Sequence, residues 1–252
     1  MGASPQPDRG AVAGDLGEQL DVAATVTHAA LGSDAPVQAA SKVAVGHAAD
    51  HLPNATATDW VSYADHVVLV SPVTEQVVPP AATELERGEG LIGRTLGMRV
   101  DQVLWSAKGA AAAPKQFDWQ AFGWQFSDDD VDALVPLAAE DAPRLELGHQ
   151  YVLAIRWESA RCTDGDQVAA QWQGLGADAM VPADGGVIGN GELEGTDQSV
   201  AQARSRASAT STGGTLEDEL AGRRVGELVS VLAATTPQPT STLTYAAAPE
   251  AC

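Results

Sequence analysis

One short segment concentrates side chains that could hold a ligand. Residues 116–126 contain five aromatic side chains: Phe117, Trp119, Phe122, Trp124 and Phe126. Indole and phenyl rings offer flat apolar faces for stacking, and the indole N–H adds a polar handle. Trp119, Trp124 and Phe122 are therefore the predicted ligand-binding residues, as a platform for a sugar or a peptide. The alternative is that these rings fill the core, because aromatic side chains bury large areas.

The sequence lacks the common catalytic motifs, and no catalytic residue is predicted. It contains no GxSxG, HExxH, SxxK or Walker A pattern. An enzyme with an unrecognised site remains the alternative, using His66 or His149 with one of three carboxylates, Asp65, Asp130 or Asp141. A deep pocket with a histidine and a carboxylate within hydrogen-bond reach would favour that alternative.

No metal site and no cofactor are predicted. His47-Ala-Ala-Asp-His51 places two imidazoles four residues apart, with Asp50 between them and His66 as a conceivable third ligand. Pro53 limits a helix there, so surface histidines are the favoured explanation of the pattern. The Asp-rich runs at 128–132 and 164–166 lack the closing Glu of a calcium loop. The two cysteines, Cys162 and Cys252, form no CxxC pair, and they are a candidate disulfide or two free thiols.

Charge and hydropathy exclude some partners. The 252 residues carry 14 Lys and Arg against 34 Asp and Glu, a net charge of −20. Such a chain repels nucleic-acid phosphates, so no nucleic acid is expected as a partner. No apolar run of 18 residues occurs, and no membrane insertion is expected. The acidity indicates either a solvated surface or an affinity for cations or a basic partner.

Hydrophobic alternation predicts a mainly β protein, a small OB-like β-barrel or sandwich with a C-terminal helix. Strands are expected near 66–73, 94–104, 116–126 and 150–157, with Leu96, Met98 and Val100 on one buried face. The aromatic phase slips just before Gly123, which predicts a β-bulge there. A short helix capped by Thr58 or Asp59 should precede the first strand.

The expected organisation has five parts. Residues 1–57 read as a low-complexity arm with a weak helix at 17–31, and residues 58–194 as the β-rich domain. Residues 195–214 read as a linker rich in small polar side chains, and 235–252 as a flexible tail. Between them, residues 215–234 should form a helix, capped by Thr215, that docks a leucine stripe on the β-rich domain.

Three segments suggest a family likeness. Ala64-Asp-His-Val-Val-Leu-Val70, Arg94-Thr-Leu-Gly-Met-Arg-Val-Asp-Gln-Val-Leu-Trp105 and Leu147-Gly-His-Gln-Tyr-Val-Leu-Ala154 resemble the strand pattern of OB-type barrels of the netrin and tissue-inhibitor-of-metalloproteinase kind. In composition, in the Trp-rich segment 117–126 and in Pro182-Ala-Asp-Gly-Gly-Val-Ile-Gly-Asn-Gly191, the chain also resembles Ala- and Asp-rich actinobacterial proteins. The first resemblance implies an exported barrel, and a cytoplasmic location is the alternative. Those modules use several disulfides, so protease inhibition is not carried over to this chain.

Together these features favour a non-catalytic binding or interaction module with a protein or small-ligand partner. The absence of a nucleophile–base pattern and the barrel-like strand pattern carry that hypothesis. The competing hypotheses are an enzyme with an unrecognised His/Asp site and a structural envelope or particle component.

Overall fold

The protein is described here from a computed structural model that covers residues 43–46, 50, 52–127, 130–163, 166–209 and 214–239. These residues lie in one unit, Ala40–Cys252; the helix expected at 17–31 lies outside them. The strands are β1 (Ala44–Gly46), β2 (His66–Val78), β3 (Gly90–Ser106), β4 (Gln116–Ser127), β5 (Asp130–Ala139), β6 (Tyr151–Glu158), β7 (Arg161–Thr163), β8 (Asp166–Val168), β9 (Gln171–Gly174), β10 (Met180–Pro182), β11 (Gly191–Leu193) and β12 (Thr196–Gln198). The helices are α1 (Ala57–Tyr63), α2 (Ala82–Arg87), α3 (Val200–Ala209), α4 (Leu216–Leu220) and α5 (Val225–Ala234), with 3₁₀ turns η1 (Ala177–Ala179) and η2 (Asp184–Gly186).

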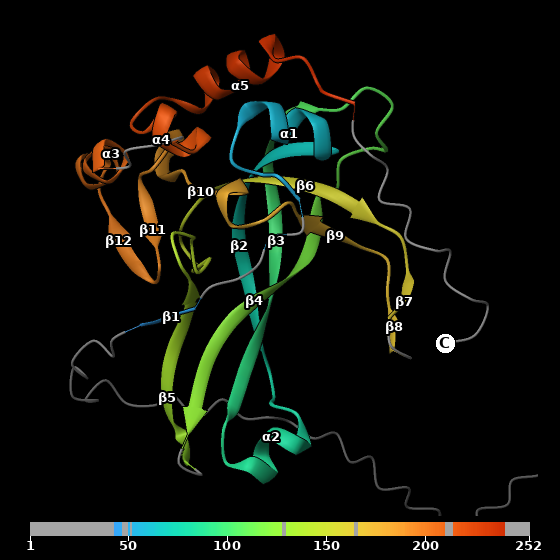
Figure 1. The fold of residues 1–252 in the computed structure, drawn as a ribbon, viewed down its shortest axis with the longest axis vertical. Helices are drawn as coiled ribbons and strands as arrows, with labels where there is room; N and C mark the ends of the chain where they lie inside the picture. Colours follow the sequence, from blue (N-terminus) through green and yellow to red (C-terminus); the bar gives the residue numbers. More distant parts are fainter. Residues whose placement is uncertain are drawn as a thin grey trace, which may run out of the picture. The chain divides into compact units, whose positions relative to one another are not determined.

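The fold is mainly β, as predicted. One sheet has the order β1-β5-β4-β3-β2-β6-β10, and β9 pairs with β6 at its side. Strands β2 to β5 follow one another as consecutive antiparallel neighbours, and β6 then returns to pair with β2 (Figure 1). The strand order has two open ends within the described residues, so the barrel or sandwich form is not confirmed.

The strands run further than the sequence indicated. We expected the first strand to end near Val73, just after Pro72, but β2 continues to Val78. Pro72 and Thr74 flank a register shift against β3, and a bulge tolerates proline because no ladder N–H is needed there. Strand β3 likewise begins at Gly90, four residues before the expected start near residue 94. Leu96 and Met98 are buried, as predicted from the alternation.

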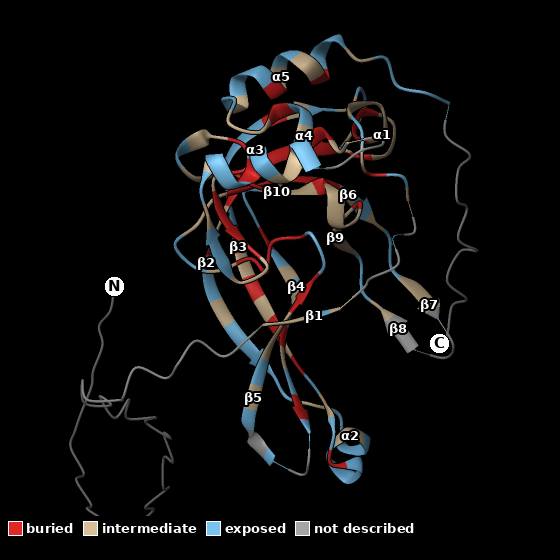
Figure 2. Ribbon diagram, turned by 60° about the vertical axis from the view of Figure 1, so that its left-hand side comes forward, coloured by how far each residue is buried: buried red, intermediate tan, exposed pale blue. Residues whose placement is uncertain are grey.

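The sheet buries side chains on both faces. On one face Val67 and Leu69 of β2 pack in a cluster with residues of α1, α4 and α5. On the other face Val68 and Val70 pack with residues from β3, β4 and β6. Figure 2 shows buried residues gathered where the helices meet the sheet, and more exposure along β2 and β5 toward α2. Burial on both faces explains the continuous apolar run at residues 67–70 of β2.

The C-terminal segment docks as predicted, but it is divided differently. Four leucines are buried in the helix-side cluster: Leu216, Leu220, Leu228 and Leu232. Thr215 caps α4 through the predicted capping box with Asp218. The single helix expected over 215–234 is wrong, because a turn with Gly222 at φ 80° separates α4 from α5. The expected linker over 195–214 is also corrected, since it contains β12 and α3.

The boundary expected at residue 57 is too late. Ala44 to Gly46 already pair in parallel with residues 137–139 of β5. Helix α1 is capped by Thr56 rather than by Thr58 or Asp59, because Thr56 and Asp59 form a reciprocal capping box. In the part of the chain that the structure describes, no helix is long and apolar enough to cross a membrane.

Candidate ligand-binding cleft

Two adjoining cavities open beside β4, and we call them together the β4–β9 cleft. The first has a volume of ≈ 220 Å³ and lies between β4 and the segment 171–180. The second has ≈ 300 Å³ and lies between β4 and the turn after β5. Both share five lining residues: Trp119, Gln120, Phe122, Ala139 and Met180. Each cavity is at or below the roughly 300–1,000 Å³ typical of sites for drug-sized ligands.

The cleft exists because one edge of β4 has no strand partner over half its length. Within the described strands, β5 pairs with β4 only from Trp124 onward, whereas residues 117–121 pair with β3 alone. Strand β9 approaches this free edge. A Cβ atom on Gly174 would lie 2.6 Å from Cη2 of Trp119, so the indole can occupy this place only because residue 174 has no side chain.

The aromatic walls are held by packing from behind. Trp119, Trp172 and Met180 pack against the buried cluster between β2, β3 and β6. The Trp172 ring also contacts Trp157, with ring centroids 5.3 Å apart, and His66, at 5.4 Å. Side chains fixed in this way form a largely prearranged surface, as ligand-binding sites require.

The mouth of the first cavity is acidic. Asp50 and Asp118 line it, and no basic side chain is among its lining within the described residues. The Asp50 carboxylate accepts a hydrogen bond from the Ala177 amide at 3.1 Å. Burial raises the pKa of nearby Asp178, and the charges of Asp50, Asp141 and Asp218 raise it further. The carboxylates on this side are therefore under-compensated by positive charge.

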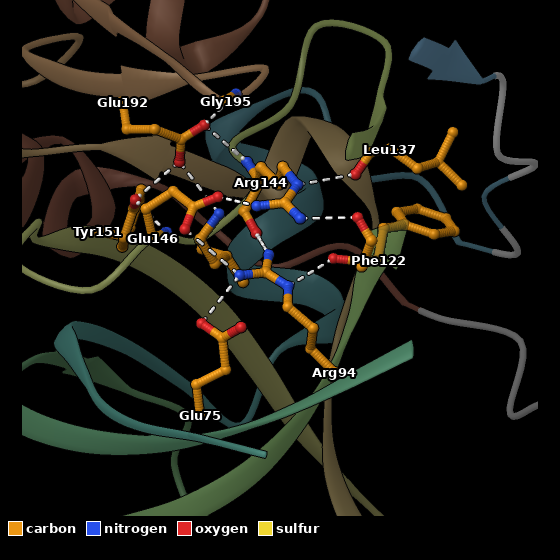
Figure 3. Close-up of polar contacts among 11 residues, drawn as sticks. Glu75, Arg94, Phe122, Leu137, Arg144, Glu146, Tyr151, Glu192 and Gly195 are labelled. Atoms are coloured by element: carbon orange, nitrogen blue, oxygen red, sulfur yellow. Dashed lines mark hydrogen bonds and ion pairs between the residues drawn. The ribbon is translucent and has the colours of Figure 1, made fainter. Parts of the chain in front are cut away.

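The second cavity is bordered by a buried polar cluster centred on two arginines (Figure 3). Arg144 donates through Nη2 to the Gly123 carbonyl at 2.6 Å and through Nε to the Leu137 carbonyl at 3.1 Å, and it pairs with Glu146. Arg94 donates through Nη2 to the Arg144 carbonyl at 2.6 Å. Both guanidinium groups are engaged in holding backbone together.

Glu192 fixes the turn that carries Arg144. Its carboxylate accepts hydrogen bonds from the amides of Arg144 and Leu145 at 3.0 Å each, from the Gly195 amide at 2.6 Å and from the Tyr151 hydroxyl at 2.7 Å. Burial and the charge of Glu192 raise the pKa of the Tyr151 phenol. Leu145 has φ 64°, a strained conformation for a bulky residue. Glu192 therefore holds a strained wall of the cleft in place.

The structure separates the three predicted ligand-binding residues. Trp119 and Phe122 line both cavities, whereas Trp124 is absent from the lining. The Trp124 ring instead lies against two guanidinium groups. Its centroid is 5.2 Å from Cζ of Arg144 and 5.9 Å from Cζ of Arg94. The predicted bulge at Gly123 is present, because Ile92 pairs with Trp124 while Gly93 pairs with Phe122. The extra residue puts Trp124 on the face of Trp119, so the separation of Trp124 follows from its place along β4, where β5 is already paired with it.

The candidate catalytic residues do not meet in the cleft. His66 is buried, bonds Ser106 at 2.9 Å, and has a lowered pKa because burial disfavours its charged form. Asp65 accepts a hydrogen bond from the Trp157 amide instead. His149 does lie 2.7 Å from a carboxylate, that of Asp184, but this pair is outside the lining of both cavities. Asp130 and Asp141 are also outside that lining.

The remaining candidates lie partly outside the described residues. His47 and His51 are outside them, and so are Asp128, Asp129 and Asp164. Within the described part, no three His, Cys, Asp or Glu side chains are grouped as metal ligands. Cys162 lies half-buried in β7, whereas Cys252 is outside the described residues, so their pairing stays a prediction.

Sequence reasoning missed the far wall of the cleft. Trp172 and Met180 belong to β9 and β10, which are four and three residues long. The only local signal for Trp172 is an indole between two glutamines, and four residues are too few to show alternation. No family model matches the chain, and no curated protein or solved structure matches it either.

Proposed function

We propose that the protein is a non-catalytic binding module that holds a small organic ligand in the β4–β9 cleft. The observation that carries the proposal is the convergence of Trp119 and Trp172 from different strands on one cavity. Amide and carboxylate groups edge the same cavity: Asp50, Asp118, Gln120, Gln171 and Gln173. Apolar walls with a few polar groups are the usual composition of a ligand site.

The candidate catalytic histidines lie outside the cleft, and this favours a binding function over a catalytic one. A general base must reach the bound substrate within hydrogen-bond distance or through one water. The described lining of the cleft contains no histidine, and the His149–Asp184 pair lies outside it. An enzyme using that pair is the competing proposal, and it requires the pair to act on a substrate bound elsewhere.

Binding is tested by calorimetric titration of the purified chain with three probe classes: neutral oligosaccharides, organic cations and short extended peptides. At least one class should bind saturably, and Trp119→Leu should abolish that binding. Trp105→Leu is the matched control, because Trp105 is also half-buried but packs against the opposite, helix-side cluster. Circular dichroism confirms that both variants fold. Binding that is equal in the two variants, or no binding by any class, would refute the proposal.

A further inference from the structure

We infer that the ligand of the β4–β9 cleft is a small organic cation with an alkylammonium or quaternary ammonium group, an inference that rests on the proposed binding function. Two features of the first cavity carry it. The cavity is walled by aromatic side chains, and its only charged lining residues within the described part of the chain are carboxylates.

The aromatic walls supply the attraction that such a group needs. Trp119, Phe122 and Trp172 line the first cavity together with the thioether of Met180. An ammonium group within about 6 Å of an indole or phenyl face is attracted by the ring quadrupole, and the indole is the strongest of these rings. A tetraalkylammonium group also presents methyl groups, so it gains from the apolar contact that a bare metal ion would lose.

The charges point the same way. Asp50 and Asp118 edge the cavity without a basic neighbour in its described lining. Burial raises the pKa of Asp178, and the charge of Asp50 raises it further, so part of the shift reflects a local field that disfavours further negative charge. An anionic ligand would be repelled at this mouth, and a cation would relieve the repulsion. In the second cavity Arg144 is the basic residue, and its guanidinium is bonded to Glu146 and to carbonyl groups.

The size of the cavity and the close approach of β9 to β4 favour a free small molecule over a side chain of a long peptide. The first cavity has a volume of ≈ 220 Å³. Trp119 lies against Gly174 so closely that a Cβ at residue 174 would be 2.6 Å from the ring. That contact closes the space between the edges of β4 and β9 at this point, where an extended peptide would otherwise continue.

The test compares two probes that differ in charge alone. Choline is titrated against the neutral alcohol in which a tert-butyl group replaces its trimethylammonium group, by calorimetry at low salt. Choline should bind roughly tenfold more tightly, the advantage expected for a cation–π contact in a partly desolvated site. A short peptide that carries trimethyllysine is the third arm, and it should bind more weakly than choline.

Two variants localise the effect. Asp118→Asn should weaken choline by roughly twofold to fivefold, the range of an exposed charge pair, and leave the neutral alcohol unchanged. Glu86→Gln removes the same charge from exposed α2, outside the cleft, and should change neither. Trp119→Leu should abolish choline binding.

The outcomes separate the two proposals. If the neutral alcohol binds as tightly as choline, or if an oligosaccharide binds through Trp119 and choline does not, the cation inference is overturned and the binding function stands. Tighter binding of the trimethyllysine peptide overturns the choice of a free ligand. If choline and every other probe class fail to bind, both proposals fall.

Discussion

Removal of the Glu192 carboxylate should destabilise the protein strongly. The side chain is 2% exposed and accepts hydrogen bonds from three backbone amides and the Tyr151 hydroxyl. Each buried donor left without an acceptor costs about 1 kcal/mol or more, so Glu192→Ala should lower the free energy of unfolding by about 4 kcal/mol. Glu192→Gln keeps Oε1 for the amides of Arg144 and Gly195 and should cost about 2 kcal/mol.

The assay is equilibrium urea denaturation followed by circular dichroism, with the free energy taken from the midpoint and the slope. Glu194→Gln is the matched control, since its carboxylate accepts from the exposed Asp141 amide. That change should cost less than about 0.5 kcal/mol. If Glu192→Ala costs under about 1 kcal/mol, or no more than the control, the carboxylate does not hold the strained turn at Leu145 and the reasoning is wrong.

Other predictions concern single positions. Burial raises the pKa of Glu217 to about 7 from an ordinary 4.5 against the opposing effect of its arginine partner, so the fold favours the protonated acid. Protonated Glu217 therefore stabilises the fold fully below pH 4.5, and this contribution is lost as the pH rises to 7. The loss amounts to about 3 kcal/mol of unfolding free energy. Glu217→Gln should remove it from the pH dependence measured by urea denaturation. Gly123→Ala should lower the melting temperature, because its Cβ would lie 2.2 Å from a β3 carbonyl oxygen. A Cβ added at Gly226 in α5 would meet nothing within 4 Å. Gly226→Ala should therefore raise the melting temperature, because it adds about 1 kcal/mol of stability. Thiol titration under denaturing, non-reducing conditions should find no free thiol if Cys162 and Cys252 pair, and two titrated thiols would disprove the disulfide.

The long strands could be predicted because their patterns are local. Leu96 and Met98 alternate with more exposed residues along β3, and residues 67–70 of β2 form a continuous apolar run, so the burial of both segments can be predicted from the segments themselves. The leucine stripe of α4 and α5 is local in the same sense. The turn at Gly222 was harder to place, since glycine within a helical pattern fits either a weak helix or a break.

The cleft could be predicted only in part. The aromatic richness of β4 marked Trp119 and Phe122 as candidates, but their neighbours come from β9 and the turn before β10, far along the chain. Which strand edge stays open depends on where β5 leaves β4, and pairing partners are set by tertiary context. The same holds for Glu192, whose role depends on a turn more than forty residues earlier in the chain.

The order of the strands along the chain also determines when, during folding, β9 covers the free edge of β4. The hairpins from β2 to β5 join neighbours in sequence, whereas β6 must close a long loop to reach β2, and the entropy of that loop delays the docking of β6 and of β9, which pairs with β6. During synthesis on the ribosome, residues 117–121 of β4 therefore emerge and pair with β3 well before β9 exists. An unpaired edge with an indole beside it is a template for foreign strands. A nascent chain interrupted before Gln171 is expected to be the form of this protein most in need of a chaperone.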